Sequence, residues 1–204
     1  MQPNATSRAL AVALWPEGVN RAVMAFVLVV AGTVVLAISA KIKVPFYPVP
    51  MTLQTFAVMA IAASYGARLA VAAVVLYLVE GAIGLPVFTN TPPAVAGPAY
   101  FLGTTGGFLI GFIALAAIVG TAADRGWDRS IVRLFAAMIA ADIVVFVLGF
   151  AWLAWGAQLA SGATGIGPAA AWAGGVVPFL LADLLKIALA ALAVPAAWML
   201  VERR

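Results

Sequence analysis

Long apolar runs dominate this chain and are separated by short groups of charged residues, prolines and glycines. An α-helix rises about 1.5 Å per residue, so about 20 apolar residues cross the roughly 30 Å hydrocarbon layer of a membrane. The pattern predicts six helices, at residues 22–40, 52–65, 67–83, 106–123, 130–155 and 178–201. The segment 52–65 is short for a full span. The expected fold class is an all-α membrane protein with six transmembrane helices.

The composition supports the same fold class. Of the 204 residues, 66% are hydrophobic and 9% are charged, and the mean hydropathy is +1.15, outside the usual range of soluble domains. No polar linker divides the chain, so residues 1–204 are expected to form a single integral membrane domain. Within it, residues 1–20 would be a cytoplasmic N-terminal segment and residues 22–201 the six-helix domain. The first apolar run lacks a cleavage site and is expected to remain as a helix.

Positive charges are distributed unevenly between the two ends of the predicted helices. Lysine and arginine collect in the cytoplasmic loops of membrane proteins. If the N-terminus is cytoplasmic, the outer loops hold only Lys41 and Lys43, and Lys186 lies within the membrane. The inner segments then hold Arg8, Arg21, Arg68, Arg125, Arg129, Arg133, Arg203 and Arg204. Both termini are therefore expected in the cytoplasm, and the net charge of +4 reflects topology rather than a nucleic-acid partner.

The chain contains no cysteine and no histidine. Disulfides, thiol nucleophiles, haem ligation and nearly all zinc chemistry therefore lack their usual residues. No G-x-x-x-x-G-K-[ST] phosphate-binding loop occurs either. We expect no metal and no cofactor, and we do not expect the chain to be an enzyme or to use ATP itself.

Two polar residues inside the last apolar run, Asp183 and Lys186, stand out. Residues three apart lie on the same helix face, and an ionisable group at membrane depth costs about 2.5 to 3.5 kcal/mol. Such groups normally face a cavity or a partner, so the pair is a candidate functional site. With a helix that begins at Pro178, both residues lie in the outer half of the membrane. Gln54, expected one turn inside its helix, and Glu80 lie at comparable depth.

Two loops on the outer side are rich in proline and aromatic residues. The loop 41–50 contains three prolines together with Tyr47. The longer loop 84–105 carries Asn90 and Tyr100, and its length points to a function because structureless loops of this size are uncommon. We expect these loops to form a lid over an outward-facing pocket. Such a pocket suits a small, partly apolar solute with a hydrogen-bonding head and an anionic tail.

Four blocks of sequence, in the same order along the chain, resemble the BioY family. They lie at residues 44–58, 80–90, 105–112 and 178–186 and read VPFYPVPMTLQTFAV, EGAIGLPVFTN, TGGFLIGF and PFLLADLLK. BioY proteins are the biotin-specific substrate-binding subunits, or S components, of energy-coupling-factor (ECF) transporters. The resemblance runs from about residue 22 to the C-terminus. It implies an S-component fold, biotin uptake across the bacterial cytoplasmic membrane, and partnership with a transmembrane coupling protein and two ATPase subunits.

The resemblance also implies roles for individual residues. Asn90 and Asp183 look like contacts to the ureido ring of biotin, whose N–H groups and carbonyl an amide and a carboxylate can satisfy. Lys186 would either hold the valerate carboxylate or neutralise Asp183. Gln54 would either touch the ligand or satisfy nearby backbone. The complete expected substrate-binding set is Tyr47, Gln54, Glu80, Asn90, Tyr100, Asp183 and Lys186, and the role of Glu80 stays open.

The chain departs from the family pattern at residues 103–108. The family usually reads Gly-Pro-Thr-Gly-Gly-Tyr, whereas this chain reads Gly-Thr-Thr-Gly-Gly-Phe. Thr104 and Phe108 therefore replace a proline and a tyrosine hydroxyl. The glycines at 106 and 107 favour close helix packing over the binding of a phosphate.

Several alternatives stay open at this point. Asp142 and Asp183 could form the carboxylate pair of an intramembrane aspartyl protease, although Lys186 would keep Asp183 ionised and the protease signatures are missing. The chain could also be a solitary biotin transporter without an ATP-driven module, or an S component for another vitamin. Membrane lipid is an expected neighbour, and a homo-oligomer stays open. The small residues Ala31, Gly32, Thr33, Ala37, Ser39 and Ala40 could either dock the coupling protein or pack within the chain.

Overall fold

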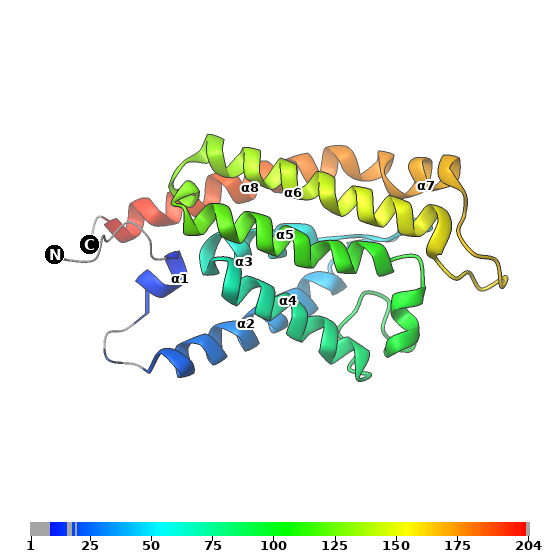
Figure 1. Cartoon of the computed structure of the whole chain (residues 1–204), viewed down its shortest axis with the longest axis horizontal. Helices are drawn as coiled ribbons and strands as arrows, with labels where there is room; N and C mark the ends of the chain where they lie inside the picture. Colours follow the sequence, from blue (N-terminus) through cyan, green and yellow to red (C-terminus); the bar gives the residue numbers. More distant parts are fainter. Residues whose placement is uncertain (1–8, 16–17, 19, 203–204) are drawn as a thin grey trace.

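The fold is a bundle of helices with one short β-hairpin (Figure 1). The computed structural model describes residues 9–15, 18 and 20–202, so Arg8, Arg203, Arg204 and part of the expected N-terminal segment 1–20 lie outside the described residues. In chain order the elements are α1 (Leu10–Ala13), α2 (Arg21–Lys41), β1 (Lys43–Val44), β2 (Met51–Thr52), α3 (Gln54–Tyr65), α4 (Ala67–Ala82), η2 (Pro98–Leu102), α5 (Gly106–Asp124), η3 (Trp127–Arg129), α6 (Ile131–Ala151), η4 (Trp152–Gly156, a π-helical turn), α7 (Pro168–Gly175) and α8 (Val177–Glu202).

The predicted segments all coincide with helices, and most of their ends differ from the observed ones by one or two residues. The hairpin pairs Lys43 with Thr52, so Thr52 is in a strand and the all-α description needs this small correction. The prediction that Gln54 lies one turn inside its helix is wrong, because Gln54 is the first residue of α3. Helix α8 begins one residue before Pro178. The additional helix α7, which precedes α8, was not predicted.

Helix α5 lies at the centre of the bundle (Figure 1). It packs against α6 on one side and against α3 and α4 on the other, while α8 contacts both α3 and α6, and α2 contacts α4. The hydrophobic core follows these contacts, with fully buried Tyr77 on α4, Leu115 on α5 and Met138 on α6. The four helices α3, α5, α6 and α8 therefore surround a common interior.

Small residues allow these helices to approach closely. A Cβ atom on Gly120 of α5 would lie only 2.5 Å from the Cα of Ala67, and one on Gly32 of α2 would lie 2.8 Å from the Cβ of Ala73. Both distances are too short for any side chain, so glycine is required at each crossing. In α2 the small residues Gly32, Thr33, Ser39 and Ala40 are buried. This part of the small-residue stripe packs within the chain, as one of the two sequence interpretations expected.

The outer surface of the bundle is apolar. Among the described residues, four helical segments are long and apolar enough to cross a membrane: Arg21–Lys41, Gly106–Asp124, Ile131–Gly156 and Pro168–Val201. Phe26 on α2 and Leu181 on α8 are each 70% exposed. Large apolar side chains exposed along several helices are expected where lipid rather than water covers the surface.

The turn between α5 and α6 is tied to the neighbouring helices by polar contacts. The indole N–H of Trp198 on α8 donates to Asp128 Oδ2 at 2.5 Å, and the guanidinium of Arg129 lies 4.2 Å from the centroid of the Trp198 ring. Asp124, at the end of α5, accepts a hydrogen bond from the backbone N–H of Ala67 at the start of α4. These contacts fix the end of the bundle opposite the hairpin.

Candidate functional site

A small cavity lies inside the bundle near the hairpin. Its volume is about 50 Å³, and it is enclosed by α3, α5, α6 and α8 together with segments of the two long loops. The apolar part of its wall includes Phe108, Phe112, Phe146 and Phe179. The polar side chains that line it are Thr52, Gln54, Thr55, Thr89, Tyr100, Thr105, Asp183 and Lys186. The cavity is thus aromatic, with a few polar groups contributed by separate elements.

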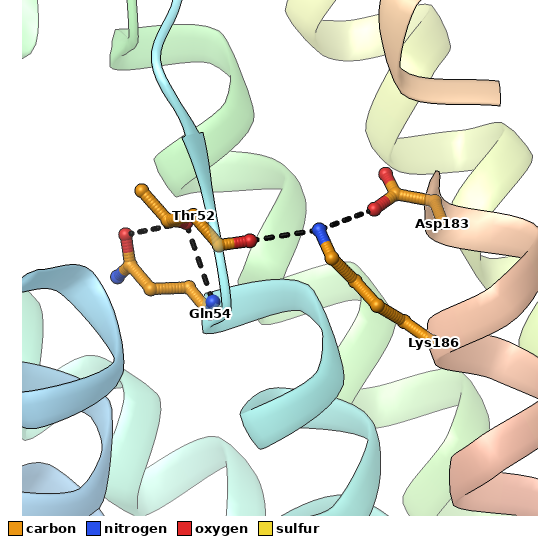
Figure 2. A network of polar contacts seen from close by, with 4 residues as sticks. All are labelled: Thr52, Gln54, Asp183 and Lys186. Carbon is orange, nitrogen blue, oxygen red and sulfur yellow. Dashed lines mark hydrogen bonds and ion pairs between the residues drawn. The ribbon is translucent and has the colours of Figure 1, made fainter. Parts of the chain in front are cut away.

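Asp183 and Lys186 form an ion pair in the wall of this cavity. Lys186 Nζ lies 2.7 Å from Asp183 Oδ1, within one turn of α8. The same ammonium donates a second hydrogen bond, also 2.7 Å long, to the carbonyl oxygen of Thr52 in the hairpin. Figure 2 shows Lys186 between these two oxygens, with Asp183 on one side and the hairpin on the other. Lys186 therefore joins α8 to the hairpin and forms an ion pair with the buried carboxylate.

Gln54 belongs to a second polar network at the start of α3. Its side-chain nitrogen donates to the hydroxyl oxygen of Tyr77 at 2.9 Å, and the Tyr77 hydroxyl donates to the carbonyl of Val87. Gln54 is 4% exposed and Tyr77 is fully buried. Gln54 thus lines the cavity and also links α3, through α4, to the loop that follows α4.

Lys41 holds the first part of that loop. Its ammonium donates hydrogen bonds to the carbonyl oxygens of Pro86, Phe88 and Thr91 at 2.7, 2.6 and 2.5 Å. The neighbouring Lys43 donates to the side-chain oxygen of Asn90. The end of α2 and the hairpin therefore fix the backbone of residues 86–91.

Aromatic contacts fix the same segment from its other side. Phe88 is fully buried, stacks on Tyr100 with ring centroids 4.6 Å apart, and meets Tyr77 and Phe101 edge to face. Burial raises the pKa of the Tyr100 phenol, more than its hydrogen bond with Thr105 lowers it. The phenol is therefore neutral at physiological pH and donates to the carbonyl of Thr89 at 2.6 Å.

The predicted site residues fall into two groups. Gln54, Tyr100, Asp183 and Lys186 line the cavity together. The structure does not bring the other predicted residues into it. Tyr47 is 89% exposed, and the half-buried Glu80 near the end of α4 is not among the lining residues. Asn90 is exposed and lines a separate outer hollow of about 290 Å³, which shares Pro50, Tyr100 and Thr105 with the cavity.

Three residues that contribute to the site were not predicted. Thr89 lines the cavity, Lys41 anchors the loop, and Thr104 donates a hydrogen bond from its hydroxyl to the carbonyl of Pro48 at 3.0 Å. The last contact ties the two outer loops together at one of the positions where the chain departs from the family pattern. The sequence carried only a general signal for these residues, namely polar side chains next to the candidate lid.

Asp142 lies one turn from the cavity wall on α6. It is 6% exposed, and its Oδ1 atom has no hydrogen-bond partner among the described residues. Val145 and Phe146, three and four residues later, line the cavity. Because Asp183 is paired with Lys186, the two aspartates do not form the proton-sharing carboxylate pair of an aspartyl protease.

An apolar helical bundle that holds an aromatic cavity with a few polar groups beneath ordered loops is typical of a membrane protein that binds a small solute. A solved structure shares this architecture. It is described as the S component for biotin from an ECF-type ABC transporter, with a TM-score of 0.70, 22% sequence identity, and coverage of 89% of this chain and 94% of that chain. The likeness establishes the S-component fold.

The chain belongs to the BioY family, whose family model matches residues 8–203. It is 34% identical over 160 residues to the biotin transporter BioY of Thermotoga maritima, covering 78% of this chain and 87% of that protein. It is 32% identical over 154 residues to the probable biotin transporter BioY of Pyrococcus horikoshii, covering 76% and 83%. The biotin transporter BioY of Rhizobium etli is 33% identical over 166 residues, with 78% and 83% covered. The chain is thus a multi-pass membrane protein of a transporter family.

Proposed function

We propose that this chain captures biotin outside the cell as the S component of an ECF-type transporter. The observation that carries the proposal is the buried Asp183–Lys186 pair in the wall of an aromatic cavity, in a chain whose relatives are biotin transporters. Biotin combines an apolar bicyclic ring, a ureido group and an anionic tail. The cavity supplies an apolar wall, hydrogen-bonding groups and a cation in one place.

The two charged residues have complementary parts in this proposal. Asp183 accepts N–H bonds from the ureido ring, as a carboxylate can accept from several donors. Lys186 leaves Thr52 and Asp183 for the valerate carboxylate, and the ureido N–H groups replace its ammonium as the donors to Asp183. Gln54 and Tyr100 complete the wall. Asn90, Tyr47 and Glu80 act from outside the cavity as parts of the lid or of the path to it.

The loops must open before biotin can enter. Ligand pockets for molecules of this size have volumes of about 300 Å³ or more, whereas the enclosed cavity measures about 50 Å³. The bonds that close the roof join Lys186 to Thr52, Thr104 to Pro48 and Tyr100 to Thr89. The first joins α8 to the hairpin, the second joins the two outer loops, and the third lies within the longer loop, so their rupture would widen the cavity towards the outer hollow.

The membrane arrangement follows from the same proposal. The whole chain forms one membrane domain in the bacterial cytoplasmic membrane, with six transmembrane helices α2, α3, α4, α5, α6 and α8 and both termini in the cytoplasm. Helices α3 and α4 have 12 and 16 residues, about 18 and 24 Å, so they span only with help from the adjacent loops. A transmembrane coupling protein and two ATPase subunits energise delivery, and the chain itself needs no cofactor.

The proposal is tested by titrating biotin calorimetrically into the purified, detergent-solubilised chain, with thiamine and riboflavin as control ligands. We expect saturable binding of biotin alone. Saturable binding of another vitamin in place of biotin would contradict the assignment. Uptake of labelled biotin by cells that express the chain with and without the coupling protein and ATPases then tests whether the module is required.

A further inference from the structure

Thr89 carries a buried hydroxyl group that no residue of the site uses. The side chain is 5% exposed, lines the cavity next to Tyr100 and Thr105, and its Oγ1 atom has no hydrogen-bond partner among the described residues. A buried hydroxyl without a partner costs about 1 to 3 kcal/mol. Such groups are rare in folded proteins and each calls for a physical reason.

The neighbouring Thr91 shows what a structural threonine does in the same segment. It is 2% exposed, and its hydroxyl donates to the carbonyl of Phe88 at 2.6 Å. The ammonium of Lys41 also approaches the Thr91 hydroxyl, at 3.3 Å. Two threonines two residues apart thus have similar burial, and only the one that lines the cavity lacks a partner.

The backbone around Thr89 is held in place on both sides, so the residue stays at the cavity wall. Lys41 bonds the carbonyls on both sides, at Phe88 and Thr91. The carbonyl of Thr89 itself accepts the phenol of Tyr100, and the preceding Phe88 is fixed in the aromatic cluster. Groups that are pre-organised in this way bind a ligand without further ordering.

We propose that Thr89 is a specificity-determining residue of the binding site, and that its hydroxyl contacts the neutral ureido head of the ligand rather than its anionic tail. This inference rests on the proposed function and adds a contact that the sequence did not predict. A hydroxyl can both donate and accept, which suits a cyclic urea that presents N–H groups and a carbonyl. The cation available for the tail is Lys186, which lies on α8 and bonds the hairpin rather than the loop of Thr89.

A valine at position 89 separates a ligand contact from a structural role. Valine has nearly the shape of threonine and lacks only the hydroxyl. Because that hydroxyl is unpaired, Thr89→Val should leave the melting temperature of the ligand-free protein unchanged or raise it. The same substitution should weaken biotin binding about tenfold or more, since a buried hydrogen bond to the ligand is lost. If Thr89 had a purely structural role, Thr89→Val would lower the melting temperature and leave the affinity for biotin unchanged.

Two further variants serve as controls. Thr89→Ser keeps the hydroxyl and should bind biotin within a few-fold of the unmodified chain. Thr121→Val removes a hydroxyl that bonds the carbonyl of Ala117 on α5, and Thr121 does not line the cavity. It should leave biotin affinity unchanged.

The decisive experiment titrates biotin and its uncharged amide into the unmodified chain, Thr89→Val, Thr89→Ser and Thr121→Val, and records the melting temperature of each without ligand. We expect Thr89→Val, and neither of the other two variants, to reduce the affinities for biotin and for its amide by the same factor. Normal binding by Thr89→Val, or a lower melting temperature with unchanged affinity, would overturn the role of Thr89 and leave the proposed function intact. A loss for biotin but not for the amide would overturn the head-group assignment. Failure of the unmodified chain to bind biotin would overturn both proposals.

Discussion

The ammonium group of Lys41 donates a hydrogen bond of 2.6 Å to the carbonyl oxygen of Phe88, 47 residues further along the chain. Two more carbonyls of the same loop, those of Pro86 and Thr91, accept from the same nitrogen. A lysine ammonium has three donors, and here three backbone carbonyls accept from it, with the Thr91 hydroxyl 3.3 Å away. Lys41 therefore acts on the binding site through the loop that it holds, although it does not line the cavity.

Replacement of Lys41 by methionine should weaken biotin binding by about tenfold or more, because hydrogen bonds to a charged group contribute about 1.5 to 3 kcal/mol each and the loop would lose its anchor. Hydrogen exchange of the backbone of residues 86–91 should rise, while that of α6 stays unchanged. Lys43→Met is the matched control, since it removes the same charge and breaks only the contact to the Asn90 side chain. If Lys41→Met and Lys43→Met changed hydrogen exchange and biotin affinity equally, the effects would come from the lost positive charge and not from the lost bonds to the loop backbone.

The role of Lys186 can be tested by comparing the affinities for biotin and for its uncharged amide. Substitution by methionine should reduce the affinity for biotin more than that for biotin amide, because only biotin carries the anionic tail. Asp183→Asn should reduce both affinities, since the ureido ring is the same in the two ligands. Both variants are to be titrated calorimetrically alongside the unmodified chain. A Lys186→Met variant with identical losses for the two ligands would show that the lysine serves Asp183 alone.

The helices could be predicted from the sequence because their apolar runs are long and continuous. The Asp183–Lys186 pair could also be found, since three-residue spacing within an apolar helix places both groups on one face. The ends of the elements were harder to place. The pairing of Lys43 with Thr52 depends on how a proline-rich loop folds back, and no local pattern specifies that register.

The loop contacts could not be predicted because their partners are far apart in the sequence and are mostly backbone. In the sequence Lys41 is only one of the two lysines of the outer loops, and its carbonyl partners lie 45 to 50 residues away. Asn90 looks like a ligand contact, yet its left-handed backbone (φ 62°) accompanies a side chain that contacts Lys43 at the surface. The structure places Thr89 in the cavity wall and Asn90 in the wall of the outer hollow, and the sequence alone does not separate these two neighbours.

Gly81 on α4 supports the same loop through packing. A Cβ atom at this position would collide with the ring of Phe88, which is fully buried. Glycine to alanine normally stabilises a helix by about 0.5 to 1 kcal/mol, whereas overpacking of a core costs about 1 to 3 kcal/mol. We therefore expect Gly81→Ala to lower the melting temperature and to weaken biotin binding. The double variant Gly81→Ala with Phe88→Leu should recover part of the lost stability, and a stabilised single variant would contradict the packing argument.

At the opposite end of the bundle, Asp128 makes the stability depend on pH. Asp128 is 1% exposed, and burial raises the pKa of its carboxyl group, more than the hydrogen bond from Trp198 and the charge of Arg129 lower it. Because the folded-state pKa lies above the unfolded value of about 3.9, the folded state holds this proton more tightly. The contribution of Asp128 to stability is therefore fully present below the unfolded pKa and is lost as the pH rises through the folded pKa.

Asp128→Asn removes this titration and keeps a side-chain oxygen that can accept from Trp198. The melting temperature of the variant minus that of the unmodified chain should become more positive as the pH is raised from about 4 towards 8. Both proteins are to be melted in the same detergent across that range, so that other titrating groups cancel in the difference. Trp198→Phe is the control for the loss of the indole hydrogen bond, because it leaves the carboxyl group in place. A difference between Asp128→Asn and the unmodified chain that stays constant with pH, or that falls, would contradict the raised pKa of Asp128.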